Sequence, residues 1–300
     1  MMYLYTIAGV RILCSIPFEL HITQESADFL QPLSEAEGNS ILMDNYYDFY
    51  MILEGKDEII DGSERGTWQN DFCFVSDPTC RFMYRRLGPG KEPFLCVERH
   101  SCEKKIIRAY YRKGEEQEVS WSRSLLNLLN LESILLDSNG LLLHSSYISY
   151  NDFGILFSAP SGTGKSTQAE LWNTYRGAEI MNGDRAALKL EHEIWKAYGL
   201  PFAGSSGIYR NESSPVQAIV ILKQYPENRI RRLSPREAFM KLYPEFMIHR
   251  FDQDFVTKTT DLISQLLCTI PVYLLECTPD ERAVEILEKE LYNKQLDDSK

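Results

Sequence analysis

The first 118 residues are built from short stretches rich in β-branched and aromatic side chains, several of them alternating between apolar and polar positions. Such stretches, separated by turn residues such as glycine and asparagine, predict strands rather than helices. The predicted strands are Tyr3–Ile7, Val10–Ile16, Tyr46–Leu53, Trp68–Val75, Cys80–Arg85, Phe94–Glu98 and Ile106–Arg112. We therefore expect residues 1–118 to form a β-rich N-terminal domain with a recognition or scaffold role.

The pattern changes after the polar segment Lys113–Glu118. Leucines between positions 125 and 136 recur at helical spacing and predict a helix that links two domains. Beyond it, apolar stretches predict strands at Leu141–His144, Tyr147–Tyr150, Gly154–Ser158, Glu179–Met181, Ala186–Leu190, Val216–Leu222 and Pro271–Glu276. The segment 119–300 is therefore expected to be a second domain, of the α/β class.

Helix signals lie between these strands. Ser234-Pro235-Arg236-Glu237 and Thr278-Pro279-Asp280-Glu281 both have the form of a capping box with proline in the first turn. They predict one helix that begins after Ser234 and another that runs from Thr278 to about Asn293. A further helix is expected over Asp254–Leu267.

The most informative motif is the glycine-rich run Ala159–Thr167, which follows a predicted strand and opens a predicted helix. Strand, glycine loop, lysine, hydroxyl residue and helix together provide inward-pointing amides that hold a polyphosphate. Ala159 stands where the usual pattern has its first glycine, which is acceptable if its φ stays negative. The alternative is a glycine turn that binds nothing. The predicted phosphate-binding residues are Ser161, Gly162, Thr163, Gly164, Lys165, Ser166 and Thr167.

Phosphoryl transfer needs a metal, charge stabilisation and a group that activates the acceptor. ATP and Mg²⁺ are the expected cofactors, with Ser166 and Asp184 as metal ligands and Lys165 on the transferred phosphate. Asp184 follows the apolar pair Ile180-Met181, at the end of a predicted strand. The alternative for Asp184 is an ordinary turn residue, since Asn-Gly-Asp favours turns.

Other candidates are more loosely placed. His144 ends a predicted strand and could orient or deprotonate an acceptor hydroxyl. Arg210 and Arg250 could stabilise a transferring phosphoryl group, although surface arginines are common. The glycine- and serine-rich loop Gly199–Gly207 could close over a ligand or could be a plain connection.

The order of these residues along the chain resembles that of a known superfamily. Residues 120–293 resemble the HPr kinase and phosphoenolpyruvate-carboxykinase-like P-loop superfamily, in which a histidine strand precedes a hairpin, a Ser-Gly-x-Gly-Lys-Ser/Thr loop and a strand that ends in an acidic pair. Here His144, Ser161–Thr167 and Gly183-Asp184 occur in that order. The resemblance implies an α/β core with a mixed sheet flanked by helices. It implies catalytic roles for Asp184, His144 and Lys165, but Gly183 occupies the first acidic position, so the identity of the base is open.

The resulting hypothesis is an ATP-dependent kinase that acts on a hydroxyl, such as a serine of a peptide or small protein. The alternative is a nucleotide-binding accessory module in peptide maturation, which the missing acid at Gly183 favours. A carboxykinase-type activity is disfavoured because no set of ligands for a carboxylate substrate is found. The N-terminal domain has a further, weaker resemblance to HPr-kinase-related proteins of peptide-modification clusters.

The composition of the chain limits the partners, the location and the cysteine chemistry that we expect. A formal net charge of −11 argues against bulk nucleic-acid binding. No apolar run has the length of a membrane span, and a cytoplasmic location is expected. The seven cysteines include no Cys-x-x-Cys pair, so reduced thiols are expected in preference to a disulfide framework. For the same reason a zinc site is disfavoured, although its ligands could come from Cys73, Cys80, Cys96, Cys102 and His100.

Overall fold

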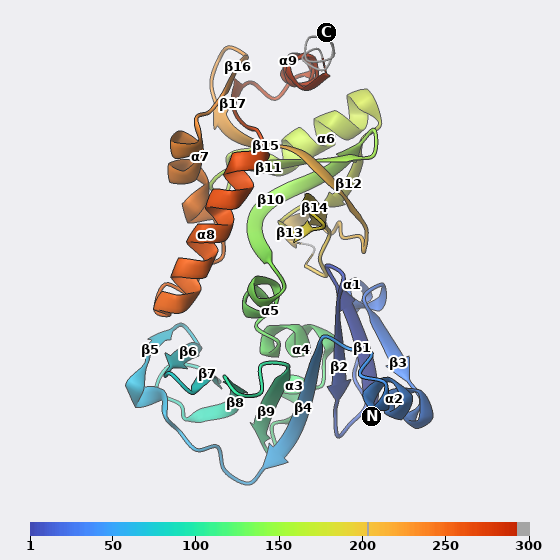
Figure 1. Cartoon of the computed structure of the whole chain (residues 1–300), viewed down its shortest axis with the longest axis vertical. Coiled ribbons are helices and arrows are strands. Elements are labelled where there is room, and N and C mark those ends of the chain that lie inside the picture. The colour runs from blue at the N-terminus through green and yellow to red at the C-terminus, as the bar shows by residue number, and fades with distance from the viewer. Residues whose placement is uncertain (203, 293–300) are drawn as a thin grey trace. The chain divides into compact units, whose positions relative to one another are not determined.

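A computed structural model describes residues 1–202 and 204–292 of the chain (Figure 1). The chain divides into two compact units, one from Met1 to Leu131 and one that begins at Glu132. Each unit has its own sheet, and among the described residues no strand of one sheet pairs with a strand of the other. The boundary thus lies at residue 131, whereas the sequence pattern placed it at residue 118.

The boundary is later than expected because the segment after residue 118 is bonded to the N-terminal strands. The hydroxyl of Tyr5 donates a 2.9 Å hydrogen bond to the Ser122 carbonyl, and the Thr23 amide donates to the Ser122 hydroxyl at 2.9 Å. The leucine stripe is also not one helix. It is divided between α4 (Ser122–Leu128) and α5 (Leu131–Asp137), with Asn130 between them at a φ of 49°.

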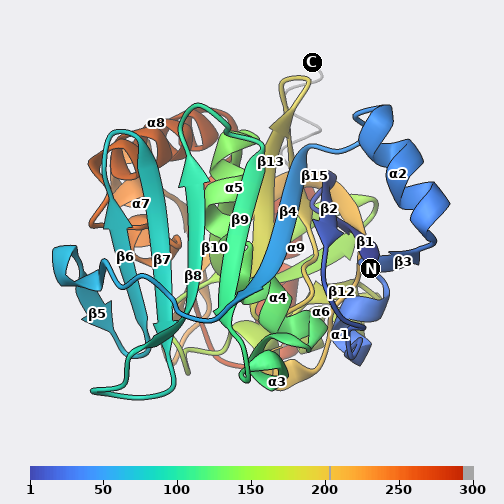
Figure 2. The same ribbon diagram turned by 90° about the horizontal axis from the view of Figure 1, so that it is seen from below.

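The N-terminal unit is built on a nine-stranded sheet with the order β3-β1-β2-β4-β9-β8-β7-β6-β5. Figure 2 shows β6, β7, β8, β9 and β4 side by side. The pairs β2–β4 and β4–β9 are parallel and the other pairs are antiparallel. The strands are β1 (Met2–Ile7), β2 (Val10–Ser15), β3 (Leu30–Leu33), β4 (Phe49–Lys56), β5 (Thr67–Gln69), β6 (Phe72–Ser76), β7 (Cys80–Arg86), β8 (Pro93–His100) and β9 (Ile106–Arg112).

The predicted β-rich character of this unit is confirmed, with two local differences. The segment Trp68–Val75 is a hairpin of β5 and β6, because Asn70 takes a φ of 56° and reverses the chain. The helices α1 (Gln24–Ala27), α2 (Glu35–Met43) and α3 (Glu116–Val119) and the 3₁₀ turn η1 (Ser63–Arg65) were not predicted. Helix α2 begins at a capping box formed by Ser34 and Glu37.

The second unit is a mixed α/β structure around an eight-stranded sheet with the order β11-β10-β13-β14-β15-β17-β16, where β12 pairs with β10. Strands β11, β15 and β17 are mutually parallel, and β11 also pairs with β15. The strands are β10 (Gly140–Tyr150), β11 (Phe153–Ser158), β12 (Glu179–Asn182), β13 (Arg185–Glu191), β14 (Ile194–Tyr198), β15 (Ser213–Gln224), β16 (Arg229–Arg232) and β17 (Val272–Cys277).

Strand β10 changes partners halfway along its length, and this change positions the candidate site. Its first part, Gly140–His144, pairs with β13, and its second part, Ser145–Tyr150, pairs with β11. The two strands predicted at Leu141–His144 and Tyr147–Tyr150 are therefore one long, curved strand (Figure 1). His144 is the last residue paired with β13, and it lies next to the end of β11.

Helices cover both faces of this sheet. Along β15, Ile219 and Ile221 pack in one core cluster with residues of α7 (Pro235–Leu242) and α8 (Gln253–Thr269). The alternating residues Val220 and Leu222 pack in a second cluster with α6 (Lys165–Arg176) and α9 (Glu281–Tyr292). Two buried faces explain why the central part of β15, Ala218–Leu222, is a continuous apolar run.

The helix starts follow the sequence signals with one correction. Ser234 caps α7 in the predicted capping box with Glu237. Helix α9 begins at Glu281, and the Asp280 carboxylate accepts from the Ala283 amide at 3.3 Å, so Asp280 acts as the cap in place of Thr278. The predicted end of this helix at Asn293 lies outside the described residues. Within the described ranges, no helix combines the length and apolar character that a membrane crossing requires.

Candidate functional site

The glycine-rich loop joins β11 to α6, in the strand–loop–helix order that the sequence predicts. Gly162 and Gly164 have φ values of +80° and +116°, and a Cβ atom at either position would meet no heavy atom within 4 Å. The loop therefore needs glycine for its backbone conformation and not for space. Ala159 is not among the residues with positive φ, which agrees with the condition for alanine at that position.

Lys165 is the first residue of α6, and its ammonium group turns back onto the loop. Its Nζ donates a 2.9 Å hydrogen bond to the Ala159 carbonyl, and the residue is 8 % exposed. Burial lowers the pKa of Lys165, while the carboxylates of Glu245 and Asp184 act in the opposite direction. The lysine thus lies within electrostatic reach of two acids from other elements.

His144 lies between those two carboxylates. Its Nδ1 is 3.0 Å from Glu245 Oε2, and its Nε2 is 3.8 Å from Asp184 Oδ1. The backbone carbonyl of His144 accepts a 3.0 Å hydrogen bond from the hydroxyl of Ser158, the last residue of β11. The change of partners along β10 therefore brings the histidine to the start of the glycine loop.

Asp184 lies in a turn that the side chain of Asn182 stabilises by hydrogen bonds to its backbone. The buried Asn182 Oδ1 accepts from the amides of Asp184 and Arg185 at 2.9 and 3.0 Å, while its Nδ2 donates to the Leu200 carbonyl at 2.8 Å. The Asp184 carboxylate is itself about one-third exposed and lies 3.2 Å from Arg185 Nε. Asn182 carries the turn role, which leaves the Asp184 side chain directed toward His144.

The second glycine loop, Gly199–Gly207, lies against the same turn. Asn182 Nδ2 also donates to the Phe202 carbonyl at 3.1 Å. A Cβ atom on Gly204 would lie 2.6 Å from the Cβ of Asp184, so this glycine permits close approach. Ala203 of this loop lies outside the described residues. The loop predicted as a possible cover is thus a neighbour of Asp184.

Glu245 was not predicted as a site residue. It ends the 3₁₀ turn η3 (Tyr243–Glu245), and its side chain is 13 % exposed. The following segment runs beside β10, where Phe246 bridges to Leu143 and the Met247 amide donates to the Leu142 carbonyl at 3.0 Å. Glu245 and His144 are 101 residues apart in sequence, and no local motif marks Glu245.

The structure does not bring the two candidate arginines to this group. Arg210 Nη1 lies 3.7 Å from Glu179 and 3.8 Å from Glu212, on the surface. Arg250 is exposed in the turn before α8, and the neighbouring His249 stacks on Phe255 with ring centroids 4.5 Å apart.

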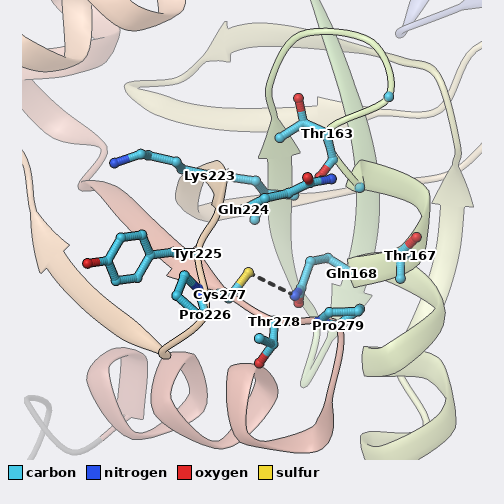
Figure 3. A pocket seen from close by; sticks show the side chains of 13 residues that line it. Thr163, Thr167, Gln168, Lys223, Gln224, Tyr225, Pro226, Cys277, Thr278 and Pro279 are labelled. Carbon is cyan, nitrogen blue, oxygen red and sulfur yellow. Dashed lines mark hydrogen bonds between the residues drawn. The ribbon is translucent and has the colours of Figure 1, made fainter.

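A cavity of about 650 Å³ opens beside the glycine loop. It lies where the parallel strands β11, β15 and β17 end, the edge at which open α/β sheets bind ligands. Figure 3 shows its lining: Thr163 and Gln168 from the loop and α6, Gln224 at the end of β15 with Tyr225 after it, and Cys277 at the end of β17. Its volume is within the range of small-molecule sites.

The side chains of Gln168 and Gln224 line this cavity. Gln168 Nε2 donates to the Cys277 sulfur at 3.4 Å, while the buried Gln168 Oε1 has no hydrogen-bond partner. Gln224 Nε2 donates to the Thr163 carbonyl at 3.3 Å and ties β15 to the loop. Beyond the glycine loop, no residue of this cavity was predicted as a site residue, because the other walls come from segments far along the chain.

No protein-family model matches the chain. No curated protein matches it either. Among solved structures, the chain is similar to the HPr(Ser) kinase/phosphatase from Coxiella burnetii, at 13% sequence identity and a TM-score of 0.31, over 53% of this chain and 92% of that chain.

Proposed function

We propose that this protein binds ATP with Mg²⁺ and transfers the terminal phosphate to a hydroxyl group. The observation that carries the proposal is the position of the glycine loop. The loop follows the parallel strand β11 and lines a cavity of about 650 Å³. The last residue of β11, Ser158, is hydrogen-bonded to the carbonyl of His144. Helix α6 begins at the loop, so its free amides favour an anion there.

The loop side would hold the nucleotide. The amides of Gly162–Ser166 and the Lys165 ammonium would contact the phosphates, and the cavity between Thr163 and Cys277 would take the nucleoside. Gln168 lines this cavity, and its side-chain amide would lie beside a bound nucleoside.

The Ser166 hydroxyl and the Asp184 carboxylate are suitable ligands for a magnesium ion. A serine hydroxyl and a carboxylate are hard oxygen ligands of the kind that Mg²⁺ prefers, and Asp184 acts electrostatically on Lys165, the neighbour of Ser166. When bound, the ion would neutralise charge that develops on the phosphates. Ser166 and Asp184 would hold it.

The acceptor would be activated beside His144. As the acceptor oxygen forms its bond to the terminal phosphorus, the bond from that phosphorus to the bridging oxygen breaks and ADP departs. The hydroxyl proton passes to Asp184 or to His144. The Glu245 carboxylate, 3.0 Å from His144 Nδ1, would hold a proton on that nitrogen and leave Nε2 as the acceptor.

Glu245 supplies a second carboxylate at a site where Gly183 stands in the position of an acidic residue. With Asp184, it gives the site two carboxylates on either side of one histidine, although the second acid comes from η3 and not from the turn. We propose that this arrangement supports transfer despite Gly183. A serine of a peptide or small protein is the proposed acceptor.

The second candidate is a nucleotide-binding accessory module without transfer activity, which Gly183 favours. The deciding experiment incubates the protein with Mg·ATP and candidate peptides and measures the mass gain of one phosphate, together with ATP hydrolysis and nucleotide affinity. Transfer to a peptide or hydrolysis that requires Asp184 supports the kinase. Tight nucleotide binding without either reaction supports the accessory module, and an absence of binding rejects both.

A further inference from the structure

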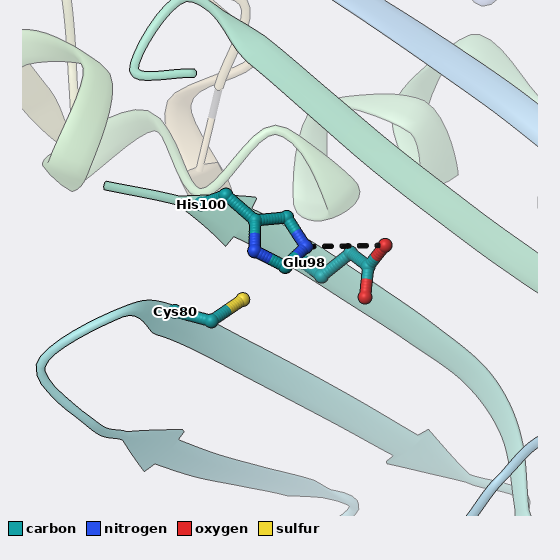
Figure 4. A group of neighbouring side chains, drawn as sticks. All are labelled: Cys80, Glu98 and His100. Atoms are coloured by element: carbon teal, nitrogen blue, oxygen red, sulfur yellow. Dashed lines mark ion pairs between the residues drawn. The ribbon is translucent and has the colours of Figure 1, made fainter. Parts of the chain in front are cut away.

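The N-terminal unit contains a group of three unlike metal-ligating side chains, Cys80, Glu98 and His100. Their sulfur, oxygen and nitrogen ligand atoms all lie within 4.8 Å of one another (Figure 4). His100 Nε2 is 3.6 Å from Glu98 Oε1. The group belongs to the nine-stranded sheet and includes none of the residues of the proposed kinase site.

The sheet register places these side chains together. Cys80 of β7 is directly opposite His100 of β8, and Phe82 is opposite Glu98. Side chains two residues apart on a strand share a face, so Cys80, Glu98 and His100 all project from the same face of the sheet. The proximity therefore follows from backbone pairing and not from chance side-chain rotation.

Hydrogen bonds at the strand ends hold the backbone of the group. The Asp77 carboxylate accepts from the amides of Thr79 and Cys80 at 2.8 Å each. Across the pair, the Ser101 amide donates to the Thr79 carbonyl at 2.9 Å. The start of β7 and the end of β8 are thus tied together next to the group.

Glu98 is further oriented by a neighbour. The Tyr110 hydroxyl, from β9, donates a 3.0 Å hydrogen bond to Glu98 Oε1. Such outer partners commonly orient the ligands of a metal site. Glu98 and Tyr110 also line a cavity of about 480 Å³, which gives an ion a path of entry on that side.

We propose that Cys80, Glu98 and His100 form a binding site for a divalent transition-metal ion, with zinc as the occupant to be tested. A thiolate and an imidazole suit zinc, whereas magnesium and calcium prefer oxygen ligands alone. Tetrahedral zinc holds its ligand atoms about 3.3–3.7 Å apart, so closure requires side-chain movements on the order of 1 Å. Three protein ligands leave one position for water or another ligand.

The sequence argued against zinc because it contains no Cys-x-x-Cys pair. A Cys-x-x-Cys pair marks zinc ligands that a local turn brings together. The group Cys80, Glu98 and His100 is formed by cross-strand pairing, which local spacing does not reveal. Cys80 and His100 were among the zinc ligands considered from the sequence, and Glu98 was not. The proposal does not rest on the proposed kinase activity.

The test uses the full-length, reduced, metal-stripped protein, titrated with zinc against a colorimetric chelator and with cobalt by absorption spectroscopy. We expect one equivalent of bound metal and a thiolate-to-cobalt charge-transfer band. Cys80→Ser should remove the band, and both Cys80→Ser and His100→Gln should lower zinc affinity by about a hundredfold or more. Tyr110→Phe should lower it less, by about tenfold.

The matched control is Cys102→Ser, since Cys102 is an exposed thiol two residues beyond His100. It should keep both the stoichiometry and the cobalt band. His100→Gln alters a partly exposed residue, so it tests the site even if Cys80→Ser does not fold. Absence of zinc binding by the wild-type protein, or equal affinity in the wild-type and His100→Gln proteins, would overturn the proposal.

Discussion

The imidazole of His144 lies 3.0 Å from the carboxylate of Glu245, although 101 residues separate them in sequence. The contact joins the middle of β10 to the end of η3, and it leaves the other ring nitrogen 3.8 Å from Asp184. The relationship gives the site a second carboxylate that no local motif predicts, and it can be tested directly.

Glu245→Gln should reduce phosphate transfer about a hundredfold while nucleotide affinity stays unchanged. The amide keeps the size of the side chain but loses the negative charge that would stabilise a proton on His144, and acid–base assistance commonly contributes a factor of about 10²–10⁴. The rate, the nucleotide Kd and the ¹⁵N shifts of His144, which report its tautomer, should be measured. Glu285→Gln, at an exposed position of α9, is the control. Equal rates in both variants would show that Glu245 is only structural.

Lys165→Ala should largely abolish the thermal stabilisation of the protein by Mg·ATP. A ligand present at about 100 times its Kd adds roughly 2.7 kcal/mol to the stability of the state that binds it. Lys165 is the cation at the loop, whereas Lys258 is an exposed lysine of α8, a helix in the other core cluster. Melting curves with and without ATP should therefore separate Lys165→Ala from Lys258→Ala. An unchanged wild-type curve at millimolar ATP would contradict nucleotide binding.

Gly164→Ala should abolish nucleotide binding, and Gly177→Ala should not. These glycines lie at opposite ends of α6, with φ values of +116° and +66°, and neither has a heavy atom within 4 Å of a Cβ position. Both substitutions strain the backbone, by about 1–3 kcal/mol, but only the first changes the amides of the loop. Calorimetric titration with ATP, paired with unfolding measurements, distinguishes loss of the site from loss of stability. Similar binding in the two variants would argue against phosphate binding by the loop.

Asp184→Asn should abolish transfer and change the stability by less than about 0.5 kcal/mol, because the carboxylate is partly exposed and Asn182 holds the turn. Asn182→Ala should act mainly on the stability of the fold. It removes a buried side chain that bonds four backbone groups, and we expect a loss of about 2–4 kcal/mol. Thermal unfolding and single-turnover assays should be compared. A large loss of stability in Asp184→Asn would assign that residue to the fold.

His144→Ala and Gly183→Asp address the identity of the base. If His144 accepts the acceptor proton, its removal should lower transfer at least a hundredfold, whereas it should have little effect if Asp184 is the base. Gly183 has no positive φ, so the backbone tolerates aspartate there. Gly183→Asp should raise activity if the missing acid marks a weakened site. A loss of activity would indicate that Glu245 already supplies the second carboxylate.

Most individual strands could be predicted from the sequence because their signals are local. Periodicity and side-chain type located both sheets within a few residues, and the glycines of the loop have the positive φ values that their motif requires. Signals that depend on neighbours in space were less informative. Strands β3, β14 and β16 were not predicted, and the leucine stripe concealed a break at Asn130. The domain boundary lies at residue 131 because Ser122 bonds to Tyr5 and Thr23.

The residues of the candidate site also separate into those that local sequence signals suggest and those that only the tertiary structure brings together. The sequence alone suggested the glycine loop, Lys165, His144 and Asp184, since each stands at the end of a predicted strand or the start of a predicted helix. The tertiary structure alone brought Glu245 to His144, placed a cavity at the ends of β11, β15 and β17, and grouped Cys80 with Glu98 and His100. The reason is physical: local residue types set backbone dihedrals and periodicity, whereas these contacts depend on strand register and on the path of segments distant in sequence.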